Sequence, residues 1–115
     1  MRYPRGPTKL RVMYGTDIAI GPGKVDLLLA IAETGSISAS AKRLGMSYRR
    51  AWLLVDTMNR CFREPVVASA AGGARGGGAS VTAFGRRVLE RYRAMQASVD
   101  HAIDPELERF AALLR

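Results

Sequence analysis

A row of side chains on one side of a predicted helix over 47–62 is the feature of this sequence best suited to chemistry. At about 100° per residue, Arg49, Leu53 and Arg60 lie on the side of that helix opposite Ala51. A guanidinium group can donate two parallel hydrogen bonds to O6 and N7 of a guanine, or it can bind a phosphate. We therefore expect this side to contact duplex DNA. The candidate DNA-binding residues are Ser47, Tyr48, Arg49, Arg50, Leu53, Thr57, Arg60 and Arg75.

These candidates have different expected roles. The first turn of the helix is predicted to enter the major groove, where its free N–H groups also attract a phosphate. Arg49 points most directly outward and is the candidate for a guanine, whereas Leu53 or Thr57 could touch a thymine methyl group. Arg50 and Arg60, nearer the edges or the far end of the helix, are expected to bind phosphates.

Two aromatic residues on the same helix are interpreted mainly as packing residues. Tyr48 lies about 60° from Ala51, half in the core, with its hydroxyl group free to reach a phosphate. Trp52 lies at about 100°, where an indole more often packs against the protein than stacks on a base. The apolar side that anchors the helix consists of Ala51, Leu54, Val55, Met58 and Phe62.

A short predicted helix over 36–44 precedes the helix over 47–62, and the two form a helix–turn–helix pattern. Helices that cross steeply need a small residue where they touch, which Ala41 supplies. The sharp turn between them needs a positive φ, which Gly45 supplies. An ordinary helical hairpin in a core would also have these residues, but the arginines on the outer side favour a DNA-reading motif.

Two short strands, over 66–69 and 79–81, are predicted to form the wing of a winged helix. The segment between them has five glycines and Arg75 within 72–78. We expect the wing over 66–81 to contact the minor groove or the DNA backbone, with Arg75 entering the minor groove. A solvated arginine on a loose hairpin is the alternative. A phosphate-binding loop is excluded, because Ala79-Ser80 stands where that motif has Lys followed by Ser or Thr.

The fold class is therefore mostly α with a small β wing, a winged helix–turn–helix extended by C-terminal helices. A strand over 9–14 and a helix over 25–34 precede the motif. The 25–34 helix is apolar on several sides, so it needs a partner besides its own core, with a second subunit as the candidate. After Thr82, a helix over 83–103 has apolar residues at heptad spacing. Asp104-Pro105 is predicted to start a final helix.

These elements divide the chain into three parts. Residues 1–8 are expected to be a flexible N-terminal tail, and 9–82 the winged helix–turn–helix domain. Residues 83–115 are expected to be helices for dimerisation. The whole net charge of +8 falls within 42–93, where eleven Lys and Arg residues stand against three acidic residues. Such a basic domain most often binds nucleic acid, the abundant polyanion of the cytoplasm.

Composition excludes several function classes. The 115 residues are enough for one domain, and no apolar run approaches the length of a membrane span. One cysteine and one histidine exclude a disulfide within the chain and leave almost no ligands for zinc. We find no catalytic set of residues. We therefore predict a cytoplasmic protein that is not an enzyme and has no cofactor and no metal site.

Several stretches carry a resemblance to a known family: 36–52, 55–59, 62–65, 72–78, Val81-Thr82 and Gly85. They resemble the DNA-binding domain of ModE-type molybdate-responsive transcriptional regulators, a LysR-like winged helix–turn–helix. The resemblance implies a homodimer that regulates promoters, often those of molybdate transport and molybdoenzyme operons. It places 47–50 in the DNA groove and Arg75 in the wing. The chain ends where the oxyanion-binding domains of the family begin, so we expect a stand-alone domain.

Two other functions stay open at this stage. The chain could pair with a full-length regulator as a heterodimer partner, which the apolar excess of the 25–34 helix permits. It could also bind DNA without sequence preference, in which case every duplex would be bound with similar affinity. Sequence-specific binding to double-stranded DNA as a homodimer is the reading that the outer arginines favour.

Overall fold

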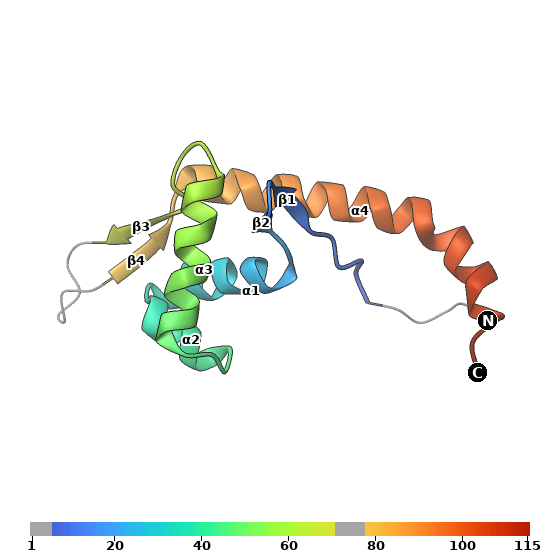
Figure 1. Cartoon of the computed structure of the whole chain (residues 1–115), viewed down its shortest axis with the longest axis horizontal. Helices are drawn as coiled ribbons and strands as arrows, with labels where there is room; N and C mark the ends of the chain where they lie inside the picture. Colours follow the sequence, from blue (N-terminus) through green and yellow to red (C-terminus); the bar gives the residue numbers. More distant parts are fainter. Residues whose placement is uncertain (1–5, 71–77) are drawn as a thin grey trace.

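The computed structural model describes residues 6–70 and 78–115 of the chain. The elements in chain order are β1 (Val12–Tyr14), β2 (Asp17–Ile20), α1 (Pro22–Thr34), α2 (Ile37–Arg43), α3 (Tyr48–Cys61), β3 (Val67–Ala70), β4 (Gly78–Val81) and α4 (Ala83–Ala111). Figure 1 shows α1, α2 and α3 gathered beside one half of α4, while the other half of α4 runs away from them. This is the predicted winged helix–turn–helix, mostly helical, with a C-terminal helix.

Helix α1 lies at the centre of the core. The side chains of Leu27, Leu28 and Ile31 are fully buried, and α1 contacts α2, α3 and β4. Burying each such side chain stabilises the fold by roughly 1.5–3 kcal/mol. The apolar excess that suggested a second subunit on this helix is therefore used within the chain. Because the large apolar side chains of α1 are buried or half-buried, they no longer indicate a heterodimer surface on this helix.

The helix–turn–helix is built from local signals that the sequence contains. Ser36 caps α2, because its Oγ accepts a hydrogen bond from the N–H of Ala39 at 3.0 Å. Gly45 has a φ of 69° in the turn, the left-handed conformation that glycine adopts without strain. Ser47 caps α3, because its Oγ accepts a hydrogen bond from the N–H of Arg50 at 3.1 Å. Each of these features confirms the prediction for this motif.

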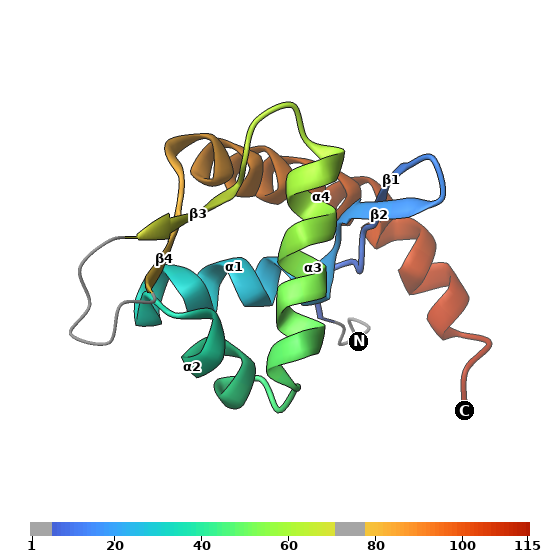
Figure 2. The same cartoon turned by 60° about the vertical axis from the view of Figure 1, so that its left-hand side comes forward.

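Two antiparallel hairpins lie on opposite sides of α3 (Figures 1 and 2). Strands β3 and β4 pair over four residues, beginning with Val67 opposite Val81, which confirms the predicted wing to within one residue. The second hairpin is a correction. We predicted one strand over 9–14, but only Val12–Tyr14 is a strand, and it pairs with β2 across a turn at Gly15, whose φ is 64°. Strand β2 has only four residues, too few for a period to be visible in the sequence.

Helix α4 is one continuous helix of 29 residues, so the predicted break at Asp104-Pro105 is wrong. Pro105 has no N–H and leaves the carbonyl group of His101 without its helical partner. Both residues are exposed, so water can take the place of that partner. The ribbon bends in this last part of the helix (Figure 1), which is the usual effect of a proline inside a helix.

The segment before β1 is attached to α4. The N–H of Thr8 donates a hydrogen bond to a carboxylate oxygen of Asp100 at 2.8 Å, and the hydroxyl group of Tyr92 donates to the carbonyl oxygen of Leu10 at 2.7 Å. Thr8 belongs to the predicted flexible tail over 1–8, so the tail is anchored at this residue. Because Tyr92 is also buried in the core, α4 and the helix–turn–helix share one hydrophobic interior.

Candidate nucleic-acid interface

The outer face of α3 consists of Ser47, Arg49, Leu53 and Arg60, all exposed to solvent. Leu53 is 45 % exposed, whereas Ala51 on the opposite side of the helix is fully buried. Figure 2 shows α3 at the front of the molecule with no other element over it. The sequence-predicted outer side is therefore a free convex surface, on a helix that is held firmly from behind.

The cations of α3 differ in how they are paired. Arg60 forms an ion pair with Asp56, with 3.1 Å between Nε and Oδ2, and it also donates to the Thr57 hydroxyl group at 3.4 Å. The side chains of Arg49 and Arg50 have no hydrogen-bond or ion-pair partner among the residues that the structure describes. Because exposed ion pairs contribute little to stability, Arg60 can exchange Asp56 for a phosphate. Arg49 and Arg50 need no such exchange.

A nearly buried lysine on α1 interacts electrostatically with residues of α3. Lys24 of α1 is only 8 % exposed, and burial lowers the pKa of its ammonium group below 10.5. Cys61 and Asp17 oppose this by raising that pKa, and the charge of Arg50 adds to the lowering. The burial of this lysine could not be predicted from the sequence, because it depends on how α1 packs beside α3.

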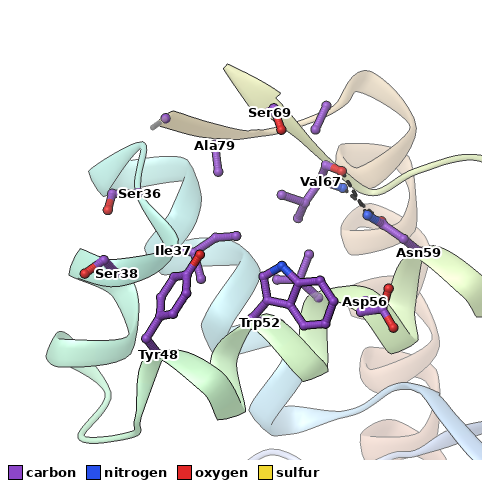
Figure 3. A pocket seen from close by; sticks show the side chains of 13 residues that line it. Ser36, Ile37, Ser38, Tyr48, Trp52, Asp56, Asn59, Val67, Ser69 and Ala79 are labelled. Carbon is purple, nitrogen blue, oxygen red and sulfur yellow. Dashed lines mark hydrogen bonds between the residues drawn. The ribbon is translucent and has the colours of Figure 1, made fainter. Parts of the chain in front are cut away.

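One flank of α3 borders a groove of about 590 Å³, which we call the Trp52 groove. Figure 3 shows the rings of Tyr48 and Trp52 standing in it. Tyr48 is 55 % and Trp52 47 % exposed, so both rings are about half-buried. This is the place predicted for Tyr48, whereas Trp52 packs against the protein less fully than we expected. The groove is lined by Ser36, Ile37, Ser38, Tyr48, Trp52, Val55, Asp56, Asn59, Val67, Ala68, Ser69, Gly78 and Ala79.

Asn59 joins α3 to the wing, a role that the sequence analysis missed. Its Nδ2 donates to the carbonyl oxygen of Val67 at 3.0 Å (Figure 3), and its Oδ1 accepts from the N–H of Val66 at 2.8 Å. The amide thus satisfies backbone groups at the start of β3 and fixes the wing relative to the outer face of α3. The sequence signal for this contact was weak, since it is a single polar residue beside the buried Met58.

Arg75, the predicted wing residue, lies outside the described residues. Within 6–70 and 78–115, no three His, Cys, Asp or Glu side chains come together in a way that could hold a metal ion. None of the helices in these ranges combines the length and the apolar character that a membrane span needs.

Comparison with known proteins finds relatives over most of the chain. It is 41 % identical over 101 residues to the molybdenum transport protein ModE of Azotobacter vinelandii, covering 86 % of this chain and 37 % of that protein. It is 39 % identical over 83 residues to the DNA-binding transcriptional dual regulator ModE of Escherichia coli K12, covering 72 % of this chain and 32 % of the relative. The chain is a ModE homologue. It spans about a third of the length of these curated relatives.

Two further comparisons bear on this ModE-like chain. A similar solved structure is the crystal structure of the CbnR_DBD–DNA complex, with a TM-score of 0.55 and 24 % identity, covering 78 % of this chain and 95 % of that one. At this level of identity the likeness concerns the fold, which is a winged helix–turn–helix. No protein-family model matches the chain.

Proposed function

We propose that this chain binds double-stranded DNA as a non-enzymatic transcriptional regulator, with α3 in the major groove. The observation that carries the proposal is the outer face of α3, where Arg49 is exposed and has no partner among the described residues. A helix whose opposite side is buried at Ala51 and Met58 is rigid enough to present side chains to base edges. The relatives named ModE support the same reading.

The proposed contacts follow the exposure and pairing of each side chain. Arg49 reads a guanine, and Leu53 contacts a thymine methyl group. Arg50, beside the outer face, and Arg60, at its far end, bind phosphates. The hydroxyl group of Thr57 donates to the carbonyl oxygen of Leu53 at 2.9 Å, which leaves its methyl group for an apolar contact. Ser47 and Tyr48 present their hydroxyl groups to the DNA backbone, and the wing over 66–81 lies on the minor groove or on the DNA backbone.

The proposed regulator is a homodimer joined through α4. Met95 is 42 %, Ile103 38 % and Phe110 57 % exposed along this helix, and water-exposed apolar side chains in such a row favour association. A hollow of about 240 Å³ with largely apolar walls adjoins Met95. Two-fold symmetry would place the two α3 helices about 34 Å apart, one turn of DNA, and predicts a near-palindromic operator. We propose promoters of molybdenum-related operons as its targets, because relatives are named for molybdenum.

Selection of bound fragments from a random pool of duplex DNA tests this function. A palindrome with half-sites one helical turn apart is the expected result. Retention of every sequence with similar affinity would identify a non-specific DNA-binding protein instead. Failure to retain any duplex at low salt, combined with co-purification of a larger regulator, would favour the heterodimer partner.

A further inference from the structure

The Trp52 groove contains two hydrogen-bond donors that the described part of the protein does not use. The hydroxyl group of Tyr48 and the Nε1–H group of Trp52 have no acceptor among the described residues. Figure 3 shows the Trp52 ring with its nitrogen on the edge that faces the wing strands. An indole and a phenol left about half exposed in a hollow keep much apolar area in water, which favours a bound group that covers them.

The walls of the groove combine apolar and polar chemistry. Its apolar side includes Val55, 7 % exposed, and Val67, 5 % exposed. Its edge has the hydroxyl groups of Ser38 and Ser69, both exposed. Among the described residues that line the groove, Asp56 is the one with a charge, and that charge is balanced by the ion pair with Arg60 at 3.1 Å. The groove therefore suits a ligand with apolar C–H surface next to acceptor oxygens.

The position of the groove indicates which ligand has that chemistry. The groove lies between α3 on one side and the β3–β4 hairpin on the other, and Asn59 fixes these two elements relative to each other. On a duplex, one sugar–phosphate strand separates the major groove from the adjacent minor groove. If α3 lies in the first and the wing reaches toward the second, that strand must cross the space between them.

We propose that the Trp52 groove holds one deoxyribose–phosphate strand of duplex DNA, with Trp52 and Tyr48 as direct contact residues. This inference rests on the proposed function. The C–H face of a deoxyribose packs on the indole, and phosphate oxygens accept from Trp52 Nε1 and from the Tyr48 hydroxyl group. The contact is independent of base identity, so it sets affinity and register, whereas Arg49 sets sequence preference.

A small effector molecule is the competing occupant, and the exposure of the walls argues against it. Small-molecule sites usually enclose most of the ligand surface. Here the two aromatic walls, Tyr48 and Trp52, are 55 % and 47 % exposed, so the groove is open along this flank of α3. A long polymer passing through fits such an open channel better than a compact ligand does.

The fluorescence of Trp52 tests the proposal directly, because it is the only tryptophan in the chain. The full chain is titrated with a duplex of mixed sequence at low salt, and the accessibility of Trp52 to acrylamide is measured with and without DNA. Binding is measured separately by the anisotropy of a labelled duplex for Trp52→Ala, Trp52→Phe and Tyr48→Phe. The matched control is Tyr14→Ala, which removes a 66 % exposed aromatic residue from the hairpin on the other side of α3.

We expect DNA to protect Trp52 from acrylamide and Trp52→Ala to weaken binding about tenfold. Trp52→Phe, which keeps a ring but loses the N–H group, should weaken binding less and leave the salt dependence unchanged, since no charge is lost. Tyr14→Ala should bind like the wild type. If DNA binds but Trp52 stays accessible and Trp52→Ala binds normally, the groove is not a DNA contact, although the proposed function survives. If no duplex binds at all, both proposals fail.

Discussion

Replacement of Arg49 by alanine is the sharpest perturbation of the outer face of α3. Arg49 is exposed and has no partner among the described residues, so its removal breaks no contact that the structure shows. A loss of affinity can therefore be assigned to DNA rather than to folding. A bidentate arginine–guanine pair is worth about 1–3 kcal/mol of discrimination. We expect Arg49→Ala to weaken binding to the selected operator by roughly 5- to 150-fold.

The assay compares two duplexes of equal length, the selected operator and a scrambled version of it. On the scrambled duplex the loss should be no more than a few-fold, because only one phosphate contact is at stake there. The matched control is Arg109→Ala, which removes the same charge near the end of α4, where Arg109 is ion-paired with Glu106 at 2.6 Å. Arg109→Ala should bind both duplexes like the wild type, and the melting temperatures of both variants should stay close to that of the wild type.

Two results would refute the reasoning about Arg49. Equal losses on both duplexes, with the slope of log K against log salt reduced by about one, would show that Arg49 contacts a phosphate and reads no base. An unchanged affinity on both duplexes would remove the outer face of α3 from the DNA interface. The burial of α3 at Ala51 and Met58 would then stabilise the fold without presenting the opposite side of the helix to DNA.

Three further predictions concern packing, protonation and assembly. Gly85→Ala should lower the melting temperature, because the added methyl group would overlap the carbonyl oxygen of Val66. Overpacking costs about 1–3 kcal/mol, which exceeds the ~1 kcal/mol gained from the higher helix propensity of alanine. A higher melting temperature would contradict this close packing. Lys24→Met should flatten the alkaline stability profile in chemical denaturation. Burial lowers the pKa of Lys24 in the folded protein below its ordinary value of 10.5. At a pH between the folded pKa and 10.5 the unfolded wild type therefore binds more protons than the folded one, so the free energy of unfolding of the wild type rises with pH there. Parallel profiles for the two proteins would refute the burial effect. Met95→Asp should weaken the proposed dimer at least tenfold in sedimentation equilibrium, and an unchanged dimer would exclude this part of α4 from the interface.

The sequence by itself was enough to predict the helix–turn–helix, because the interactions that define this motif are local. The caps at Ser36 and Ser47 each join residues three positions apart. Gly45 needs only its own missing side chain to adopt a φ of 69°. The buried side of α3 follows from a 3.6-residue period, so the exposure of Arg49 could be predicted from its angle to Ala51 alone.

Features that depend on contacts between residues far apart in the sequence could not be predicted and are seen only in the tertiary structure. The burial of Lys24 and the exposure of Trp52 depend on which neighbours α1, α2 and the wing bring to each flank of α3. Strand β2 is too short to show a period, and it forms because β1 supplies the hydrogen bonds. Tyr92 bonds to the carbonyl oxygen of Leu10, 82 positions earlier, which anchors the N-terminal segment on α4. Such pairs arise only once the core has formed, since no local preference brings their members together.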